Sequence, residues 1–552
     1  MKARKEARIA ACMVAAGMMF NTANAVVPIP DVELIPNTPG TPETRSIPFN
    51  AWPDDLSVYG YVEEEYLVSG LANIYRYVPL AFPSPLVEVD EADIPYVTRI
   101  LVRRPMDSEP FGGTVMLEFL NATAGYDDAP MWNYPWRGIV ERRAAWVGVT
   151  YDAVTAGFMK NRWGTPVFPN PEGVQPRNRD RYATLDIREW PLVWDFMMQV
   201  AALLKSDDPD NPFAAQTVER IIPTGYSQSA ALVTTLANSF HEIAQQFDAT
   251  APGRSIDLFD GYFFGDGGVQ ARNLVGSGQD RVLPLEDFRN VFLFGDGGFI
   301  PRAPVIRFFD EPAEEPRDSP LANWYQLGNP WVRTYEMAGG AHVDADLWNK
   351  GDRNDFVNFG TMREPLACGN PMNTVSMGDA MSALFTALED WIRDGTPPPD
   401  AALVARNPDS TPMRDTDGNV VGGLRSPRID VPLGVYSRSN IYPPGVNPFD
   451  PGTWGDWEPV FCPLFGGFGP FSDEELERRY PFRSAYVRQI ERAVSRAVAD
   501  GFLLPEAGTR IIAEAEASDV GETDPGSSST LDLWFLFVLG YLAFARLARR
   551  KH

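Results

Sequence analysis

The sequence predicts an α/β protein with a mainly parallel β-sheet and helices on both faces. Apolar, strand-like runs at residues 114–120 and 145–150 enclose a helical pattern at 136–143. A longer helical pattern at 187–205 precedes another apolar run, which ends at Gly225. Strands that alternate with helices in this way build parallel sheets covered on both faces.

That last apolar run leads into the most informative motif of the chain, Gly225-Tyr226-Ser227-Gln228-Ser229. Gly-x-Ser-x-small between a strand and a helix is typical of a nucleophile elbow, where the flanking residues must be small because the chain doubles back. Ser229 stands where a second glycine is usual. Ser227 is therefore the candidate nucleophile, and an ordinary strand–helix junction is the alternative interpretation.

Histidine, the usual general base beside such a serine, occurs only three times in the chain, at positions 241, 342 and 552. His552 is the last residue, and His241 lies too close to the elbow along the following helix to turn back over Ser227. His342 follows a strand-like run in a glycine-containing loop, which suits a base that must reach another strand. It is the predicted general base, with a hydrogen-bonded loop histidine as the alternative.

A triad in the chain order Ser–acid–His needs a carboxylate between Ser227 and His342. A hydrophobic strand-like run at residues 303–309 ends in acids. We predict Glu311 as the triad acid, with Glu314 as the second choice and Asp310 as a further rival.

The oxyanion hole is expected to use backbone N–H groups, one of them from Gln228, the residue after the nucleophile. The second donor is expected in the loop after the strand at 114–120, from Asn121 or its neighbour Ala122. Two identical Phe-Gly-Asp-Gly-Gly segments, at 264–268 and 294–298, are interpreted as turns.

With these motifs the chain resembles the bacterial α/β-hydrolase-domain family of secreted serine hydrolases with a Gly-x-Ser-Gln-Ser-Ala elbow. The resemblance implies an α/β-hydrolase fold and carboxylic-ester chemistry, but no particular substrate. It extends over segments at residues 113–125, 221–230, 259–262, 336–344, 368–373, 391–398 and 417–427.

Composition excludes several classes of function. The formal net charge of −26 argues against nucleic-acid binding, which needs a basic surface. Three histidines cannot build a histidine-rich metal cluster, so we expect no metal and no organic cofactor.

Two cysteines remain beyond the N-terminal segment, Cys368 and Cys462; they form a disulfide candidate in an exported chain, with two buried free thiols as the alternative.

The chain ends carry targeting signals. Basic residues, an apolar stretch and a small-x-small site before residue 26 indicate a cleaved signal peptide. Near the C-terminus, 13 apolar residues at 533–545 precede a basic end. That run is short of the ~20 residues that usually span a bilayer, so a retained membrane anchor and a processed sorting signal both stay open, and a buried amphipathic helix is the weakest alternative.

The predicted organisation follows from these boundaries. It comprises a signal peptide (1–25), a Pro-rich arm (26–50), an α/β-hydrolase core (51–400) with a lid-like insertion (152–182), a C-terminal extension packed on the core (401–517), a linker (518–530) and a hydrophobic tail (531–552). We expect an exported serine hydrolase, periplasmic or at the cell surface, whose tail is either a membrane anchor or a processed sorting signal. Its predicted substrate is a small-molecule or lipid-like carboxylic ester. The alternatives are an amidase or peptidase with the same triad, and a non-catalytic binding protein on this scaffold.

Overall fold

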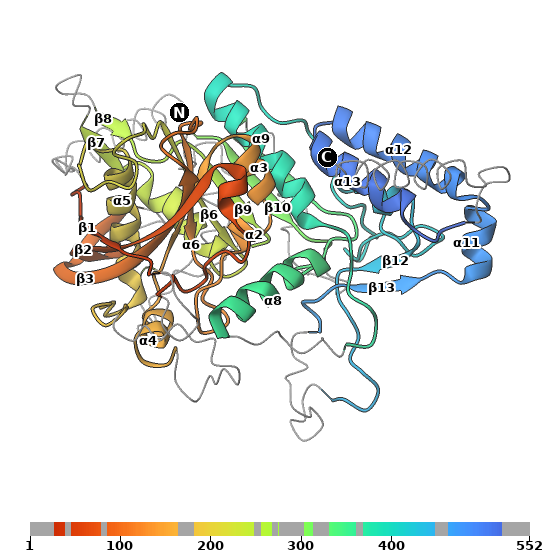
Figure 1. Cartoon of the computed structure of the whole chain (residues 1–552), viewed down its shortest axis with the longest axis horizontal. Helices are drawn as coiled ribbons and strands as arrows, with labels where there is room; N and C mark the ends of the chain where they lie inside the picture. Colours follow the sequence, from red (N-terminus) through yellow and green to blue (C-terminus); the bar gives the residue numbers. More distant parts are fainter. Residues whose placement is uncertain are drawn as a thin grey trace, which may run out of the picture.

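A central sheet organises the computed structural model of the chain (Figure 1). The structure describes residues 27–38, 46–78, 86–163, 181–247, 255–267, 274, 303–312, 330–359, 368–447 and 462–521. Nine strands form the sheet in the order β1-β2-β3-β5-β4-β6-β9-β10-β11. Their bounds are β1 Asp31–Ile35, β2 Tyr61–Tyr77, β3 Val87–Pro105, β4 Thr114–Phe119, β5 Ala145–Val149, β6 Arg220–Tyr226, β9 Tyr262–Gly265, β10 Val305–Phe309 and β11 Val332–Glu336.

The sheet is mainly parallel, as the sequence predicts. Across the sheet, the neighbouring strands β5, β4, β6, β9, β10 and β11 all pair in parallel. The pairs β1–β2, β2–β3 and β3–β5 are antiparallel. The carboxyl ends of β6, β9, β10 and β11 therefore meet at one edge of the sheet. In parallel α/β sheets this edge is where ligand sites are found.

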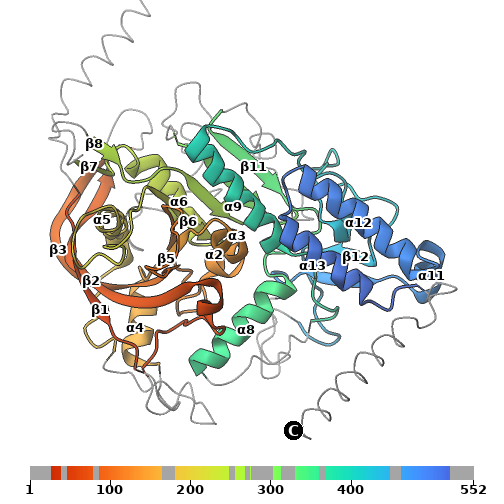
Figure 2. The same cartoon turned by 45° about the horizontal axis from the view of Figure 1, so that its top comes forward.

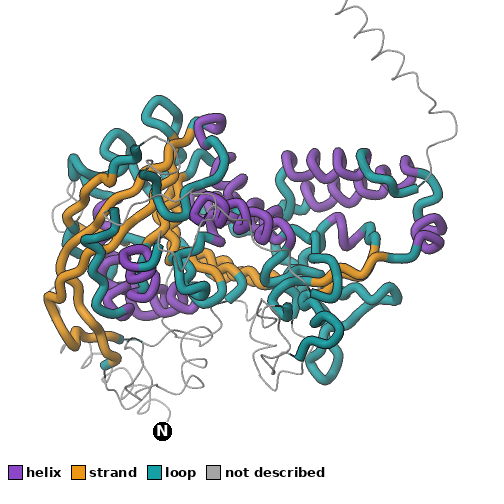
Figure 3. Tube along the Cα trace, turned by 60° about the horizontal axis from the view of Figure 1, so that its bottom comes forward, coloured by secondary structure: helices purple, strands orange, loops and turns teal. Residues whose placement is uncertain are grey.

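Both faces of the sheet are buried, as the residues of a single strand show. Successive side chains of a strand point to opposite faces of the sheet. Along β4, Val115, Leu117 and Phe119 join the core that contains helix α5, whereas Met116 joins the core that contains α2, α3 and α9. Figure 3 shows helices on the two sides of the strands. The main helices of this body are α2 Pro130–Asn133, α3 Trp136–Glu141, α4 Ala153–Asn161, α5 Val193–Leu204, α6 Ala230–Thr235, α8 Ala345–Phe359 and α9 Met377–Asp394.

Shorter elements complete this body. They are the 3-10 helices η1 Leu56–Tyr59 and η2 Trp190–Leu192, the π-helix η3 Leu236–Phe240, and the strand pair β7 Gln245–Phe247 and β8 Ser255–Asp257.

The C-terminal extension builds a further layer beside the β11 end of the sheet (Figures 1 and 2). It has its own apolar cluster, in which α12 packs on α13 through Ile490, Val494 and Ile511. Its elements are α10 Pro427–Asp430, β12 Gly434–Ser437, β13 Gly467–Pro470, α11 Asp473–Arg479, α12 Arg483–Ala499 and α13 Pro505–Glu516.

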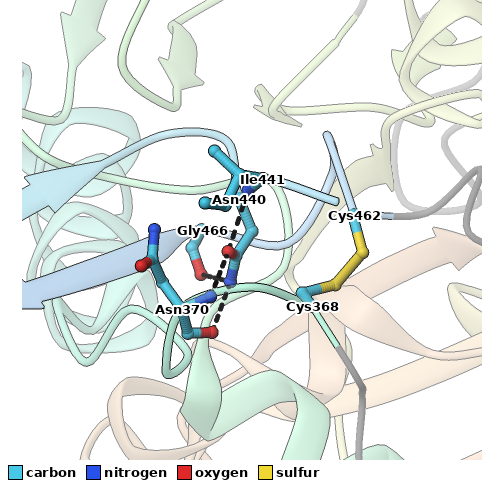
Figure 4. Close-up of a disulfide and its surroundings, with 6 residues drawn as sticks. All are labelled: Cys368, Asn370, Asn440, Ile441, Cys462 and Gly466. Atoms are coloured by element: carbon cyan, nitrogen blue, oxygen red, sulfur yellow. Dashed lines mark hydrogen bonds between the residues drawn. A yellow bond between two sulfur atoms is a disulfide. The ribbon is translucent and has the colours of Figure 1, made fainter. Parts of the chain in front are cut away.

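The predicted disulfide is present and joins the segment before α9 to the C-terminal extension. Cys368 and Cys462 are bonded across a sequence separation of 94 residues (Figure 4). Beside it, the amide of Asn440 accepts a hydrogen bond from the N–H of Asn370 (3.0 Å) and donates to the Asn370 carbonyl (2.9 Å). The alternative of two free thiols is thereby excluded in this structure.

Several predicted features lie outside the described residues. These are the signal peptide, most of the lid-like insertion (164–180), the tail, Glu314 and the second Phe-Gly-Asp-Gly-Gly segment. Within the described part of the chain, no helix combines the length and the apolar character that crossing a membrane requires.

Breaking the disulfide is expected to lower the stability of the fold. Cross-linking a loop of this length restricts the unfolded chain by about 4–5 kcal/mol in the chain-entropy account. Urea unfolding of the wild-type protein should therefore show a clearly lower midpoint with a reductant than without it. The Cys368→Ser/Cys462→Ser variant is the control, because its lowered midpoint should not respond to the reductant; equal midpoints for oxidised and reduced wild-type protein would contradict the prediction.

Candidate active site

Ser227 lies on a sharp turn between β6 and α6, as the elbow motif predicts. Its backbone φ is 55°, in the left-handed region that side chains rarely adopt. The chain returns so closely that a Cβ on Gly225 would lie 2.6 Å from the carbonyl oxygen of Ser229. The N–H of Ser227 donates to the carbonyl of Gly265 at the end of β9 (2.9 Å), which fixes the turn against the neighbouring strand.

His342 faces Ser227 from the loop after β11. Its Nε2 lies 2.9 Å from the Ser227 hydroxyl oxygen. The His342 carbonyl accepts a hydrogen bond from the Tyr226 hydroxyl (2.6 Å), so the residue before Ser227 also holds the backbone of His342. Burial raises the pKa of Tyr226 well above its ordinary value, which keeps this hydroxyl protonated and able to donate.

The other ring nitrogen of His342, Nδ1, is hydrogen-bonded to the carboxylate of Asp266. Asp266 follows β9, which lies next to β6 in the sheet, and only 6% of its side chain is exposed. An acid in this position fixes the imidazole tautomer and stabilises the imidazolium. The prediction that Glu311 is the partner of His342 is therefore wrong, and the acid comes from the first of the two segments interpreted as turns.

Glu311 has a different set of partners. Its buried carboxylate accepts hydrogen bonds from the Arg414 guanidinium (2.6 Å) and from the N–H of Gly339 (3.1 Å). Its predecessor Asp310 lies beside the triad instead, because adjacent residues at a strand end point to opposite sides. The N–H of Asp310 donates to Asp266 Oδ1 (3.0 Å).

Asp266 is held in the ionised form. Burial acts to raise the pKa of its carboxyl group, but His342, the Asp310 N–H and Arg438 outweigh burial and bring the pKa below its ordinary value. The ionised Asp266 carboxylate can therefore accept the hydrogen bond from Nδ1 of His342.

Of the predicted oxyanion-hole donors, Asn121 is wrong, whereas Gln228 and Ala122 remain candidates. The N–H of Asn121 donates to the carbonyl of Asp128 (2.8 Å), so this donor is already engaged. Among the described residues, the N–H groups of Gln228 and Ala122 have no hydrogen-bond acceptor. The Asn121 side chain instead donates to the carbonyl of Tyr226 (2.9 Å), which ties the loop to the elbow.

Buried polar groups hold that loop in place. The Asp127 carboxylate accepts from the Arg99 guanidinium (3.1 Å) and from the Thr150 hydroxyl. At the far end of the loop, the Glu118 carboxylate accepts from the N–H of Met131 (3.0 Å) and the indole of Trp146 (2.7 Å). These contacts fix the backbone between β4 and α2 at Asp127 and at Met131, as a preorganised set of N–H donors requires.

Asp266, Asp310 and His342 also satisfy a distance criterion for a metal site, since their ligand atoms lie within 4.8 Å of one another. Each carboxylate already accepts hydrogen bonds, and the Arg438 guanidinium lies 2.7 Å from Asp310. A guanidinium in contact disfavours a second cation at the same oxygens. The cluster suits a hydrogen-bonded triad better than a metal site.

A signal in the sequence could have identified Asp266. It is an acid placed directly after an apolar strand, in the stretch that follows the elbow helix. The turn interpretation of Gly265-Asp266-Gly267 is correct for the backbone, since Asp266 has a φ of 40°, but it overlooked the side chain.

Comparisons with known proteins agree with this architecture. A family model described as "Alpha/beta hydrolase domain" matches residues 29–513. No curated protein matches the sequence.

Solved structures give more distant matches. Esterase Est22 with p-nitrophenol is 12% identical, with a TM-score of 0.27 over 52% of this chain and 76% of its own. A fungal esterase from Rhizomucor miehei is 11% identical, with a TM-score of 0.28 over 59% and 82%. A lidless serine hydrolase from Xanthomonas campestris is 10% identical, with a TM-score of 0.23 over 48% and 84%. At such low identities and TM-scores these likenesses carry no information about substrate.

The identity of the acid can be tested by two amide substitutions. Asp266→Asn should lower kcat by about ten-thousand-fold, because the amide cannot hold the required tautomer of His342 or stabilise its imidazolium. Glu311→Gln should mainly lower the thermal midpoint, since it weakens the contact with Arg414 away from the reacting atoms. Ester hydrolysis by both purified variants is the measurement, and a larger loss of kcat in Glu311→Gln than in Asp266→Asn would restore the original assignment.

Proposed function

Because the chain belongs to the alpha/beta hydrolase domain family, we propose that it is a serine hydrolase that cleaves carboxylic esters through an acyl-enzyme. One observation carries this proposal. Ser227, His342 and Asp266 form a continuous series of hydrogen bonds at the carboxyl ends of β6, β11 and β9. A nucleophile, a base and an orienting acid in this geometry are what acyl transfer requires.

In the first half of the reaction Ser227 Oγ attacks the ester carbonyl carbon while its proton passes to His342 Nε2. The negative charge that develops on the carbonyl oxygen is met by the N–H groups of Gln228 and Ala122. Asp266 stabilises the imidazolium without taking its proton. Collapse of the tetrahedral intermediate breaks the bond to the alcohol oxygen, which leaves with the proton from His342.

In the second half a water molecule takes the place of the alcohol. His342 Nε2 removes its proton as the water attacks the acyl carbon, and the oxyanion again lies against the two N–H groups. The intermediate then expels Ser227 Oγ, which recovers a proton from His342 and releases the carboxylic acid. Each proton transfer uses the same nitrogen, because the triad acid holds the other one.

The two alternatives differ from this proposal in measurable ways. An amidase or peptidase would use the same residues and would be recognised by its substrates. A non-catalytic binding protein has no need of a strained serine aligned with a base, and φ of 55° at Ser227 is a conformation that active sites retain at a cost in stability.

We also propose that the protein is exported and that the apolar run at 533–545 with its basic end serves as a membrane anchor or as a processed sorting signal. The signal-peptide pattern supports export, and the bond between Cys368 and Cys462 fits an oxidising compartment. N-terminal sequencing of the protein from its native cells should begin at Val26. A chain that retains Met1 and lacks the bond between Cys368 and Cys462 would contradict export.

Fluorophosphonate labelling of the full chain tests the catalytic proposal. The reagent reacts with serines activated by a neighbouring base, so peptide mapping should locate the adduct on Ser227. Labelling should be lost in Ser227→Ala and lowered by at least about a thousand-fold in His342→Ala, as in other triads.

Ser229→Ala is the matched control, because Ser229 lies two residues away in the same motif, and its hydroxyl serves only the backbone of Tyr226. This variant should keep the adduct on Ser227. A folded wild-type protein that reacts with neither the reagent nor any ester would leave the binding-protein interpretation as the better one.

A further inference from the structure

The C-terminal extension places three arginines against buried carboxylates at the ends of β10 and β11. Each pair lies within 2.7 Å, and each carboxylate is almost fully buried. Two of the pairs are separate from the triad, whereas the third touches it. The pairs are Arg406–Glu336, Arg414–Glu311 and Arg438–Asp310.

Asp310 lies between Arg438 and the triad acid. Arg438 Nε donates to Asp310 Oδ2 (2.7 Å), and the Asp310 N–H donates to Asp266 Oδ1 (3.0 Å). A carboxylate oxygen of Asp310 also lies within 4.8 Å of a carboxylate oxygen of Asp266. A continuous path of contacts therefore runs from the extension through Asp310 and Asp266 to His342.

Two carboxylates this close, and both buried, cannot easily be ionised together. With both charged, the cluster of Asp266, Asp310 and Arg438 would carry one uncompensated negative charge while His342 is neutral. With one proton on Asp310, the charges of Asp266 and Arg438 cancel. Burial and the adjacent Asp266 raise the pKa of Asp310 well above its ordinary value, against the opposing effect of Arg438.

We propose that Asp310 is a positioning residue of the triad, which as a neutral carboxylic acid donates a hydrogen bond to Asp266 and accepts one from Arg438. The extension then helps to hold and to neutralise the triad acid. This inference rests on the proposed function and adds two residues to its machinery. The other titratable groups that face the cluster are His342, Tyr226, Tyr134, Asp344 and Glu311.

Two substitutions at Asp310 distinguish a side chain that donates a hydrogen bond to Asp266 from one that only contributes packing volume. Asparagine keeps a carbonyl that accepts from Arg438 and an NH₂ that donates to Asp266, whereas leucine keeps only the volume. Asp310→Asn should lower kcat/KM for a soluble p-nitrophenyl ester by less than about tenfold, and Asp310→Leu by more than about a hundredfold. We call the fall of kcat/KM toward low pH the acid limb of its pH profile. In Asp310→Asn this limb should lie at the same pH as in the wild-type protein, because the substitution of a neutral carboxylic acid removes no charge.

The result that overturns the proposal is equally specific. If Asp310 were ionised, Asp310→Asn would remove a negative charge near His342 and move the acid limb to lower pH. Equal losses of kcat/KM in the asparagine and leucine variants would also overturn it, because hydrogen-bond donation would then make no difference.

Arg438→Gln gives a second test if the leucine variant does not fold. In the proposed state Asp310 already holds its proton, so the lost positive charge can be compensated only by proton binding at Asp266 or His342. The acid limb should move to higher pH by at least about half a unit. Arg406→Gln is the control: it removes an arginine of the same extension from Glu336, at the end of the neighbouring strand, and should not move the limb.

If the acid limb of kcat/KM lies at the same pH in Arg438→Gln and in Arg406→Gln, Arg438 has only a structural role and the proposal is wrong. Failure of this inference is distinguishable from failure of the proposed function. A wild-type protein inert toward esters and toward fluorophosphonate defeats both. An active wild-type protein whose Asp310 variants behave alike defeats the inference alone.

Discussion

The left-handed turn at Ser227 is the constraint on which the rest of the site depends. A side chain in this conformation is unfavourable by roughly 1–3 kcal/mol, so the surrounding structure has to impose it. Gly225 allows the chain to return against Ser229, and the Gly265 carbonyl receives the Ser227 N–H. With the turn imposed, the hydroxyl lies beside Nε2 of His342, and the N–H of Gln228 has no acceptor in the part of the chain that the structure describes.

The other members of the site are aligned on this turn from independent directions. Tyr226, the residue before the nucleophile, binds the backbone of His342 and so couples the position of the base to that of the serine. Asn121 binds the Tyr226 carbonyl from the loop after β4. The extension contributes as well, since the N–H of Val343 donates to the carbonyl of Leu464 (3.0 Å) near the disulfide. The C-terminal extension is thus part of the framework of the site.

Local patterns predicted the fold and singled out Ser227 and His342, which the structure brings together, whereas the carboxylate beside His342 depended on the order of the strands. The elbow is a contiguous motif, and His342 is one of only three histidines, so both could be found without knowing the sheet. The sequence placed an acid after β10, but the imidazole reaches across β10 to the end of β9. Which carboxylate meets Nδ1 depends on strand order and on the direction of adjacent side chains, and neither is encoded locally. The prediction of Asn121 as an oxyanion-hole donor was wrong for a similar reason. Its N–H donates to the carbonyl of Asp128 on the other side of a loop, and no sequence motif specifies how that loop folds back.

The central claim is that Ser227 carries the acyl group during turnover, and trapping that intermediate tests it most directly. The wild-type protein would be mixed with a p-nitrophenyl ester, quenched in acid within the first turnovers, and its peptides mapped by mass spectrometry. The acyl mass should appear on the peptide that contains Ser227, at close to one group per chain when deacylation is the slower step. Ester turnover with the acyl group on another residue, or turnover that continues in Ser227→Ala, would contradict it.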